Sequence, residues 1–169
     1  VFVSAYAIRY LVDKHIEEIE IIGKNKVYSL NLDNILTKNH LIMSELVESM
    51  LYQEEVFLIK KITTEISKLH LSGSLILFGS YAKKTFKEDS DIDIFYLGEL
   101  KETETIKIKA IGKTYGKTIN LKTATIQNFE SGLRKKDALT MEILKYHLIL
   151  QNQDAFINAL WRYYNEIRG

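Results

Sequence analysis

Leu75-Ile-Leu-Phe-Gly-Ser-Tyr-Ala-Lys-Lys-Thr-Phe-Lys-Glu-Asp-Ser-Asp-Ile-Asp-Ile-Phe-Tyr-Leu97 contains two apolar runs joined by a polar segment. The first run ends in Gly79-Ser80, and ten residues separate Ser80 from Asp91. Asp93 follows after one isoleucine and leads into the second run. Each run is short, apolar and bounded by polar or turn residues, which predicts two buried strands. The rest of the chain is interpreted as supporting or covering this pair.

Helical and strand patterns alternate on both sides of the pair. The helical pattern that precedes it, over residues 38–70, fits one long helix or two helices broken near Tyr52-Gln-Glu-Glu55. The expected elements that follow are strands over 75–78 and 92–97, a short helix over 81–86, a polar loop over 87–89, a helix over 105–116, a strand over 118–126 and helices from Gln127 onward.

Asp91 and Asp93 stand at i and i+2 at the start of the second predicted strand. Side chains at that spacing point to the same face of a strand, with Cα atoms roughly 6.5 Å apart. Two carboxylates so placed can share one or two Mg²⁺ ions together with phosphate oxygens and water. Paired ions stabilise both the attacking and the leaving oxygen in phosphoryl or nucleotidyl displacement.

Gly79-Ser80 ends the first predicted strand and begins the short helix. Backbone N–H groups at such a strand-to-helix turn favour an anion, and glycine lets the backbone approach a phosphate closely. Ser80 adds a hydroxyl, and Ser90 offers a second one next to Asp91. Lys83, with Lys84, can balance the charge of a triphosphate. Together these residues predict a phosphate-binding turn that faces a two-carboxylate metal site.

The segments Phe78-Gly-Ser-Tyr-Ala-Lys83 and Asp89-Ser-Asp-Ile-Asp93 resemble the signature of the polymerase beta-type nucleotidyltransferase superfamily. They are most similar to its minimal (MNT-like) branch, which includes antitoxins paired with HEPN toxins. The resemblance implies an α+β fold with a short mixed sheet flanked by helices. It also implies that Gly79 and Ser80 hold nucleotide phosphates, that Asp91 and Asp93 ligate Mg²⁺, and that an NMP passes to a hydroxyl while pyrophosphate leaves.

One residue departs from that family pattern. A third carboxylate is usual on the next strand, but the segment Lys117-Thr-Ile-Asn-Leu-Lys122 carries Asn120 at the aligned position. Asparagine is neutral and cannot take a proton. General-base assistance is typically worth about 10²–10⁴-fold in rate, so its loss slows transfer without abolishing it. Either the alignment is shifted, or the protein is a weak or degenerate transferase.

The N-terminal residues form a separate pattern. A helix is expected over 4–14, a strand over 16–22, a turn at Gly23-Lys-Asn25 and a return strand over 26–30. This order resembles the second half of a winged helix-turn-helix, so we expect one unit over 1–37 and a nucleotidyltransferase domain over 38–169. A plain helix and hairpin packed on the rest is the alternative. DNA binding requires several cations and this unit carries few, so dimerisation and partner docking stand beside DNA binding as its possible roles.

The composition excludes several other classes of protein. The 169 residues carry a net charge of +1, so no strongly basic nucleic-acid footprint is present at the level of the whole chain. Without cysteine there are no disulfides or thiolate zinc sites. No apolar run is long enough to span a membrane, and no signal segment opens the chain, so we expect a cytoplasmic protein. Since Val1 is the first residue, we also expect a trimmed N-terminus.

Two classes of function follow from these patterns. The first is an Mg²⁺-dependent nucleotidyltransferase that moves an NMP, with AMP from ATP as the first expectation, to a protein or RNA hydroxyl. That enzyme would act alone or as an antitoxin against a HEPN-type toxin. The second is a winged-helix DNA-binding regulator whose transferase fold only binds nucleotide or a partner. In either case we expect a homo-oligomer or a hetero-complex.

Overall fold

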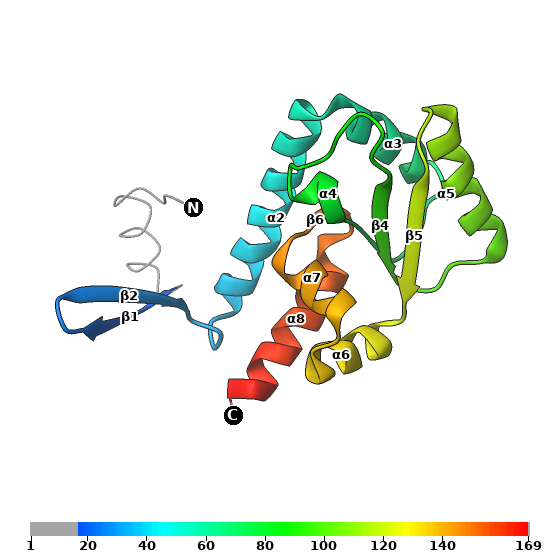
Figure 1. The fold of residues 1–169 in the computed structure, drawn as a ribbon. Helices are drawn as coiled ribbons and strands as arrows, with labels where there is room; N and C mark the ends of the chain where they lie inside the picture. Colours follow the sequence, from blue (N-terminus) through cyan, green and yellow to red (C-terminus); the bar gives the residue numbers. More distant parts are fainter. Residues whose placement is uncertain (1–16, 169) are drawn as a thin grey trace.

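The computed structural model describes residues 17–168, and Figure 1 shows their arrangement. The elements are, in chain order, β1 (Glu17–Ile22), β2 (Asn25–Leu30), α2 (Ile35–Glu55), α3 (Phe57–Ser67), β3 (Ser74–Phe78), α4 (Gly79–Ala82), β4 (Ile92–Leu97), α5 (Glu102–Thr114), β5 (Ile119–Ala124), α6 (Ile126–Lys135), α7 (Ala138–Lys145), β6 (Leu148–Gln151) and α8 (Gln153–Arg168). Among the described residues, no helix is both long and apolar enough to cross a membrane.

A four-stranded mixed sheet forms the centre of the molecule, with strand order β5-β4-β3-β6. β3 pairs antiparallel with both β4 and β6, whereas β4 pairs parallel with β5. The parallel pair is connected through α5, as parallel strands require a crossover. Helices cover both faces of this sheet (Figure 1). The α+β class with a small mixed sheet flanked by helices is therefore confirmed.

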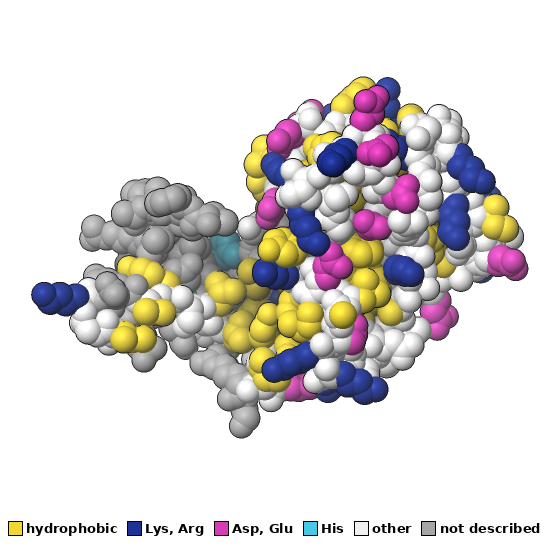
Figure 2. Space-filling view, viewed as in Figure 1, with side chains coloured by type: hydrophobic (Ala, Val, Ile, Leu, Met, Phe, Trp, Pro, Cys, Tyr) yellow, Lys and Arg dark blue, Asp and Glu magenta, His cyan; other side chains and the backbone are white. Residues whose placement is uncertain are grey.

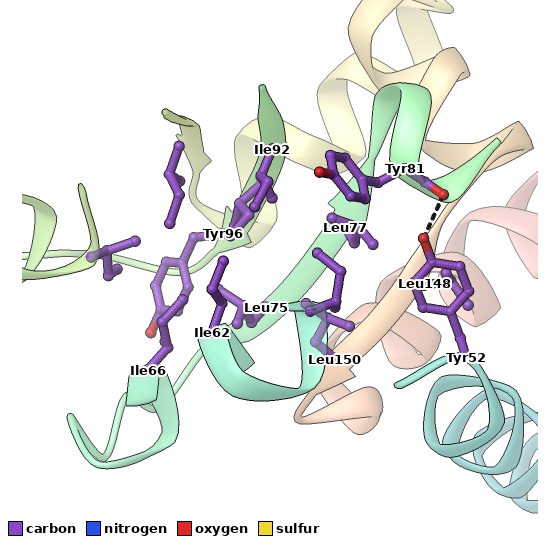
Figure 3. Close-up of a cluster of buried hydrophobic side chains, with 14 residues drawn as sticks. Tyr52, Ile62, Ile66, Leu75, Leu77, Tyr81, Ile92, Tyr96, Leu148 and Leu150 are labelled. Carbon is purple, nitrogen blue, oxygen red and sulfur yellow. Dashed lines mark hydrogen bonds between the residues drawn. The ribbon is translucent and has the colours of Figure 1, made fainter. Parts of the chain in front are cut away.

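Side chains of the central strands alternate between two hydrophobic clusters. Leu75, Leu77, Ile92 and Ile94 join one cluster with residues of α3 and α5 (Figure 3), whereas the intervening side chains of β3 and β4 pack against α6, α7 and α8. Because both faces are covered, β3 is buried at all five positions. This double burial explains the unbroken apolar run that the sequence shows there.

Tyr52 ties α2 to the central motif. Its hydroxyl donates a hydrogen bond of 2.7 Å to the backbone carbonyl of Tyr81 in α4 (Figure 3). Both rings are almost fully buried, and burial raises the pKa of Tyr52 above that of an exposed tyrosine. The short α4 segment is therefore anchored to a long helix from an earlier part of the chain.

The β1–β2 hairpin forms its own two-stranded sheet, which projects beside the start of α2 (Figure 1). Ile22 pairs with Asn25, so the turn consists of Gly23 and Lys24, and Gly23 has a φ of +64°. A two-residue hairpin turn favours positive φ, which glycine adopts without steric cost. The predicted hairpin is present, one residue tighter in its turn, whereas the helix expected over 4–14 lies outside the described residues.

Several predicted boundaries differ from the structure. The helical stretch over 38–70 is two helices, since the chain breaks at Val56, whose φ and ψ of −112° and 81° are not helical. The short helix is α4, which begins at Gly79 rather than Tyr81 and has only four residues. α5 begins three residues before the predicted start, and β5 is shorter than the predicted strand at both ends.

The prediction of helix throughout the C-terminal part was wrong at β6. Leu148, Ile149 and Leu150 are buried, and β6 pairs with β3 through Leu148, Ile149 and Gln151, although β3 lies about seventy residues earlier in the chain. Leu148 continues the helical spacing of Ile143 and Leu144. A four-residue strand with three apolar residues, set between two helices, therefore has no periodicity of its own, and only the long-range pairing reveals it.

Candidate functional site

The two carboxylates lie together at the beginning of β4. Ile92 and Ile94 point into the hydrophobic core, so alternation along the strand turns Asp93, and Asp91 just before it, to the opposite face. Further along, this face is covered by helices that pack on Phe95 and Leu97. Asp91 is exposed and Asp93 is half-buried, so both carboxylates are accessible from outside.

Gly79 lies directly against Asp93. Phe78 pairs with Asp93 across β3 and β4, and the chain then turns at Gly79, whose φ is +68°. A Cβ atom added to Gly79 would lie 2.1 Å from Oδ2 of Asp93 and 2.8 Å from its Cγ. This position therefore requires glycine twice, for its backbone conformation and for the space that the carboxylate occupies. The sequence predicted a close backbone approach to a ligand here, and the structure shows a close approach to the carboxylate.

Asn120 lies on the other side of Asp93 from Gly79, so that Gly79, Asp93 and Asn120 form a row across the sheet. It pairs in register with Asp93 on the parallel strand β5, and its Nδ2 lies 3.2 Å from Oδ1 of Asp93 and 3.4 Å from Oδ2 of Asp91. The amide thus donates long hydrogen bonds to both carboxylates. Asn120 therefore lies next to the two acids, and its assignment to the position of the family's third carboxylate stays a prediction.

The residues predicted to bind phosphate are only partly gathered at this point. Ser80 follows Gly79 in α4 and is half-exposed, whereas the Ser90 hydroxyl accepts a hydrogen bond of 2.8 Å from the backbone N–H of Lys87. Lys84 forms an ion pair with Glu55 at 2.6 Å, on α2. The predicted helix N-terminus has little dipole to offer, because α4 is a single turn.

Lys83 remains close to the acids, but it has a partner that the sequence did not suggest. Its Nζ donates to the carboxylate of Glu142 on α7. This hydrogen bond is the main cause that raises the pKa of Lys83, and the negative charges of Glu142 and Asp93 act in the same direction. Glu142 is fifty-nine residues away in the chain. Only the packing of α7 beside α4 brings the two together.

A cleft of about 630 Å³ opens beside Asp93 and Asn120 and follows the edge strand β5. Three lysines line it, namely Lys109 and Lys113 from α5 and Lys122 from β5. No local sequence motif singles out these lysines as part of the site. Two signals were nevertheless present, since Lys109 and Lys113 are four residues apart on a helix and Lys122 follows Asn120 by two on a strand.

The donor atoms of the site fit a hard divalent cation with few protein ligands. Among the described residues, no group of three or more His, Cys, Asp or Glu side chains is placed to hold a metal ion. Two carboxylates nevertheless match what Mg²⁺ usually takes from a protein when substrate phosphates and water supply its other ligands. The site is therefore suited to an ion that arrives together with a phosphate-bearing substrate.

Comparisons with known proteins identify the fold family. No curated protein matches the chain significantly. A crystal structure of a toxin-antitoxin with AMP-PNP is similar over 63% of this chain and 85% of that chain, with 16% identity and a TM-score of 0.43. A similarity this weak assigns neither a function nor a partner. The model of the nucleotidyltransferase domain family matches residues 59–153, which is more than half of the chain and includes the whole row from Gly79 to Asn120. The chain therefore belongs to the nucleotidyltransferase domain family.

Proposed function

We propose that this protein transfers an NMP from an NTP, with ATP as the preferred donor, to a hydroxyl group of a protein or RNA partner. The observation that carries this proposal is the row formed by Gly79, Asp93 and Asn120, with Asp91 beside it. Asp93 and Asn120 lie on the adjacent strands β4 and β5, and Gly79 lies at the turn directly after β3. Family membership supports the type of reaction. The geometry supports the assignment of these particular residues to it.

The proposed metal ligands are Asp91 and Asp93. A bound Mg²⁺ would neutralise charge on the triphosphate and stabilise the oxygens that exchange at phosphorus. For an ion to bind there, the donating amide group of Asn120 has to turn away from the carboxylates, so that its carbonyl oxygen can face the ion. Asn120 cannot act as a base, so the proton of the acceptor hydroxyl leaves to water or to a substrate oxygen.

The proposed phosphate-binding group consists of Gly79, Ser80 and Lys83, with Ser90 as a further hydroxyl near the acids. Ser80 is accessible and follows directly after the glycine that contacts Asp93. Lys83 exchanges Glu142 for a phosphate oxygen, or contacts both, when the nucleotide binds. In this arrangement Glu142 positions the ammonium group before the substrate arrives. Ser90 is engaged by a backbone N–H, so its hydroxyl oxygen has one fewer site for the substrate.

Labelled ATP, Mg²⁺ and candidate acceptors test the proposal. The double variant Asp91→Ala with Asp93→Ala is expected to lose at least about 100-fold in transfer rate, since the electrostatic groups of such sites are each worth about that much. Asp89→Ala is the matched control, because Asp89 is an exposed acid in the preceding loop and lies outside the row. Transfer that is equally fast in the double variant and in the control contradicts the proposal.

Two finer roles are proposed on narrower grounds. The first is the role of an antitoxin that modifies or covers a HEPN-type toxin, and the sequence resemblance supports it. It is tested by mass spectrometry of the partner encoded by a neighbouring gene after incubation with ATP. A winged-helix DNA-binding regulator is favoured by the two-residue turn of the β1–β2 hairpin, which carries exposed Lys24 at the expected wing tip. A gel mobility shift on the full-length protein at low salt tests that role, and absence of a shift contradicts it.

A further inference from the structure

We propose that the cleft along β5 binds the phosphate backbone of a single-stranded RNA, whose terminal hydroxyl then lies beside Asp93 as the acceptor. This inference rests on the proposed nucleotidyl transfer and names the class of its acceptor. The cleft joins Asp93 and Asn120 to three lysines, Lys109, Lys113 and Lys122, within one continuous volume of about 630 Å³.

These three lysines have no acidic partner among the residues that the structure describes. The ion pairs there involve other cations, including Lys83 and Lys84, which are held by Glu142 and Glu55 near α4. The charge around the site is therefore divided. On the α4 side the lysines are neutralised by carboxylates, whereas on the β5 side they are available to an anion. Figure 2 shows basic side chains over α5 and β5 and acidic side chains over the neighbouring part of the sheet.

The placement of the lysines favours a ligand that passes over the edge of the sheet. Lys122 shares a face of the sheet with Asn120 and Asp93, since it follows Asn120 by two residues and pairs with Phe95. Lys109 and Lys113 come from α5, which packs through Ile108 on the opposite face. A lysine on an edge strand also discourages pairing with other strands. That role accounts for Lys122 alone and leaves the two lysines of α5 unexplained.

An RNA strand fits this arrangement better than a protein acceptor does. Lys109 and Lys113 are one helical turn apart, which gives a rise of about 6 Å and suits a polymer with a phosphate at every nucleotide. The strand also ends in hydroxyl groups, which the reaction requires. A terminal hydroxyl oxygen would form a bond to the α-phosphorus of the NTP while the bond to the β-phosphate oxygen breaks. Pyrophosphate leaves with that electron pair, and the hydroxyl proton passes to water.

Fluorescence anisotropy with a labelled single-stranded RNA, without NTP or Mg²⁺, tests the inference on the full chain. The triple variant Lys109→Ala, Lys113→Ala and Lys122→Ala is expected to bind at least tenfold more weakly. The negative slope of log K against log salt concentration is expected to become shallower by roughly 2, at about 0.7 for each of the three lost phosphate contacts. The matched control replaces three exposed lysines outside the cleft by alanine, at Lys61, Lys107 and Lys135, and keeps its affinity and its slope.

Binding of ATP with Mg²⁺, measured on the same variants by calorimetry, separates this inference from the proposed function. Loss of RNA binding with ATP binding retained supports the RNA cleft. An equal loss of ATP binding in the triple variant overturns it, because the lysines would then hold the triphosphate. Absence of RNA binding by the unchanged protein, or binding of an acidic peptide in its place, also overturns it while the proposed function stands. If the unchanged protein binds no nucleotide at all, the proposed function itself fails.

Discussion

Gly79→Ala is the substitution for which the structure makes the sharpest prediction. The new Cβ atom would lie 2.1 Å from Oδ2 of Asp93, whereas ordinary contacts begin at 3.4 Å. The carboxylate must therefore move by more than 1 Å, or β3 and β4 must separate. In addition, an L-residue at a φ of +68° costs about 1–2 kcal/mol in the left-handed region.

The magnitude follows from these two terms. We expect the free energy of unfolding to fall by roughly 2–5 kcal/mol, because overpacking typically adds about 1–3 kcal/mol to the backbone term. A displacement of about 1 Å at a reacting group can lower a rate by about 100-fold, so transfer is expected to fall by that factor. Denaturant unfolding measures the first quantity, and labelled nucleotide transfer under conditions where the variant is folded measures the second.

Gly116→Ala is the matched control. Gly116 has a φ of +67°, but nothing lies within 4 Å of its added Cβ. It therefore carries the backbone cost alone, and the difference between the two variants isolates the contact with Asp93. If Gly79→Ala is destabilised no more than Gly116→Ala and still transfers nucleotide at the normal rate, the reasoning about Gly79 and Asp93 is refuted.

Two further substitutions test other parts of the molecule. Asn120→Asp replaces the amide group that donates hydrogen bonds to Asp91 and Asp93 by a third negative charge. We expect at least about tenfold tighter Mg²⁺ binding by calorimetry, faster transfer, and a lower melting temperature in the absence of metal. An unchanged affinity for Mg²⁺ would count against the metal assignment. Tyr52→Phe removes one of the two hydrogen bonds that the buried Tyr81 carbonyl accepts, since the backbone N–H of Lys84 still donates to it at 3.1 Å. We therefore expect denaturant unfolding to show a loss of about 0.5–1.5 kcal/mol. Because burial raises the pKa of Tyr52, its contribution is complete below the ordinary tyrosine pKa of about 10 and is lost as the pH rises above it, so stability should fall more steeply at high pH in the unchanged protein than in the Phe variant.

The local parts of the site could be predicted from the sequence because their geometry is set within a few residues. The face shared by Asp91 and Asp93 follows from strand alternation, and the turn at Gly79 follows from the end of an apolar run. The position of Asn120 required one further assumption, namely the register of a parallel strand, and the structure places it beside Asp93.

Other features depend on contacts between distant segments and left little trace in the local pattern. The partner of Lys83 is Glu142, which only the packing of α7 brings close. The cleft lysines lie on two elements that meet at the edge of the sheet, so no single window of sequence contains them all. β6 was missed for the same reason, since three apolar residues and Gln151 between two helices become a strand only by pairing with β3.

The position of β6 has a consequence for how the protein is made. β3, which leads into Gly79, remains an open sheet edge on one side until residues 148–151 have left the ribosome. During synthesis one edge of a mostly apolar strand is thus unpaired while about seventy later residues are added. Unpaired apolar edges favour aggregation and pairing with other chains. A nascent chain that stalls before Leu148 would therefore carry Gly79, Asp91, Asp93 and Asn120 yet be unable to pair the strand that leads into Gly79.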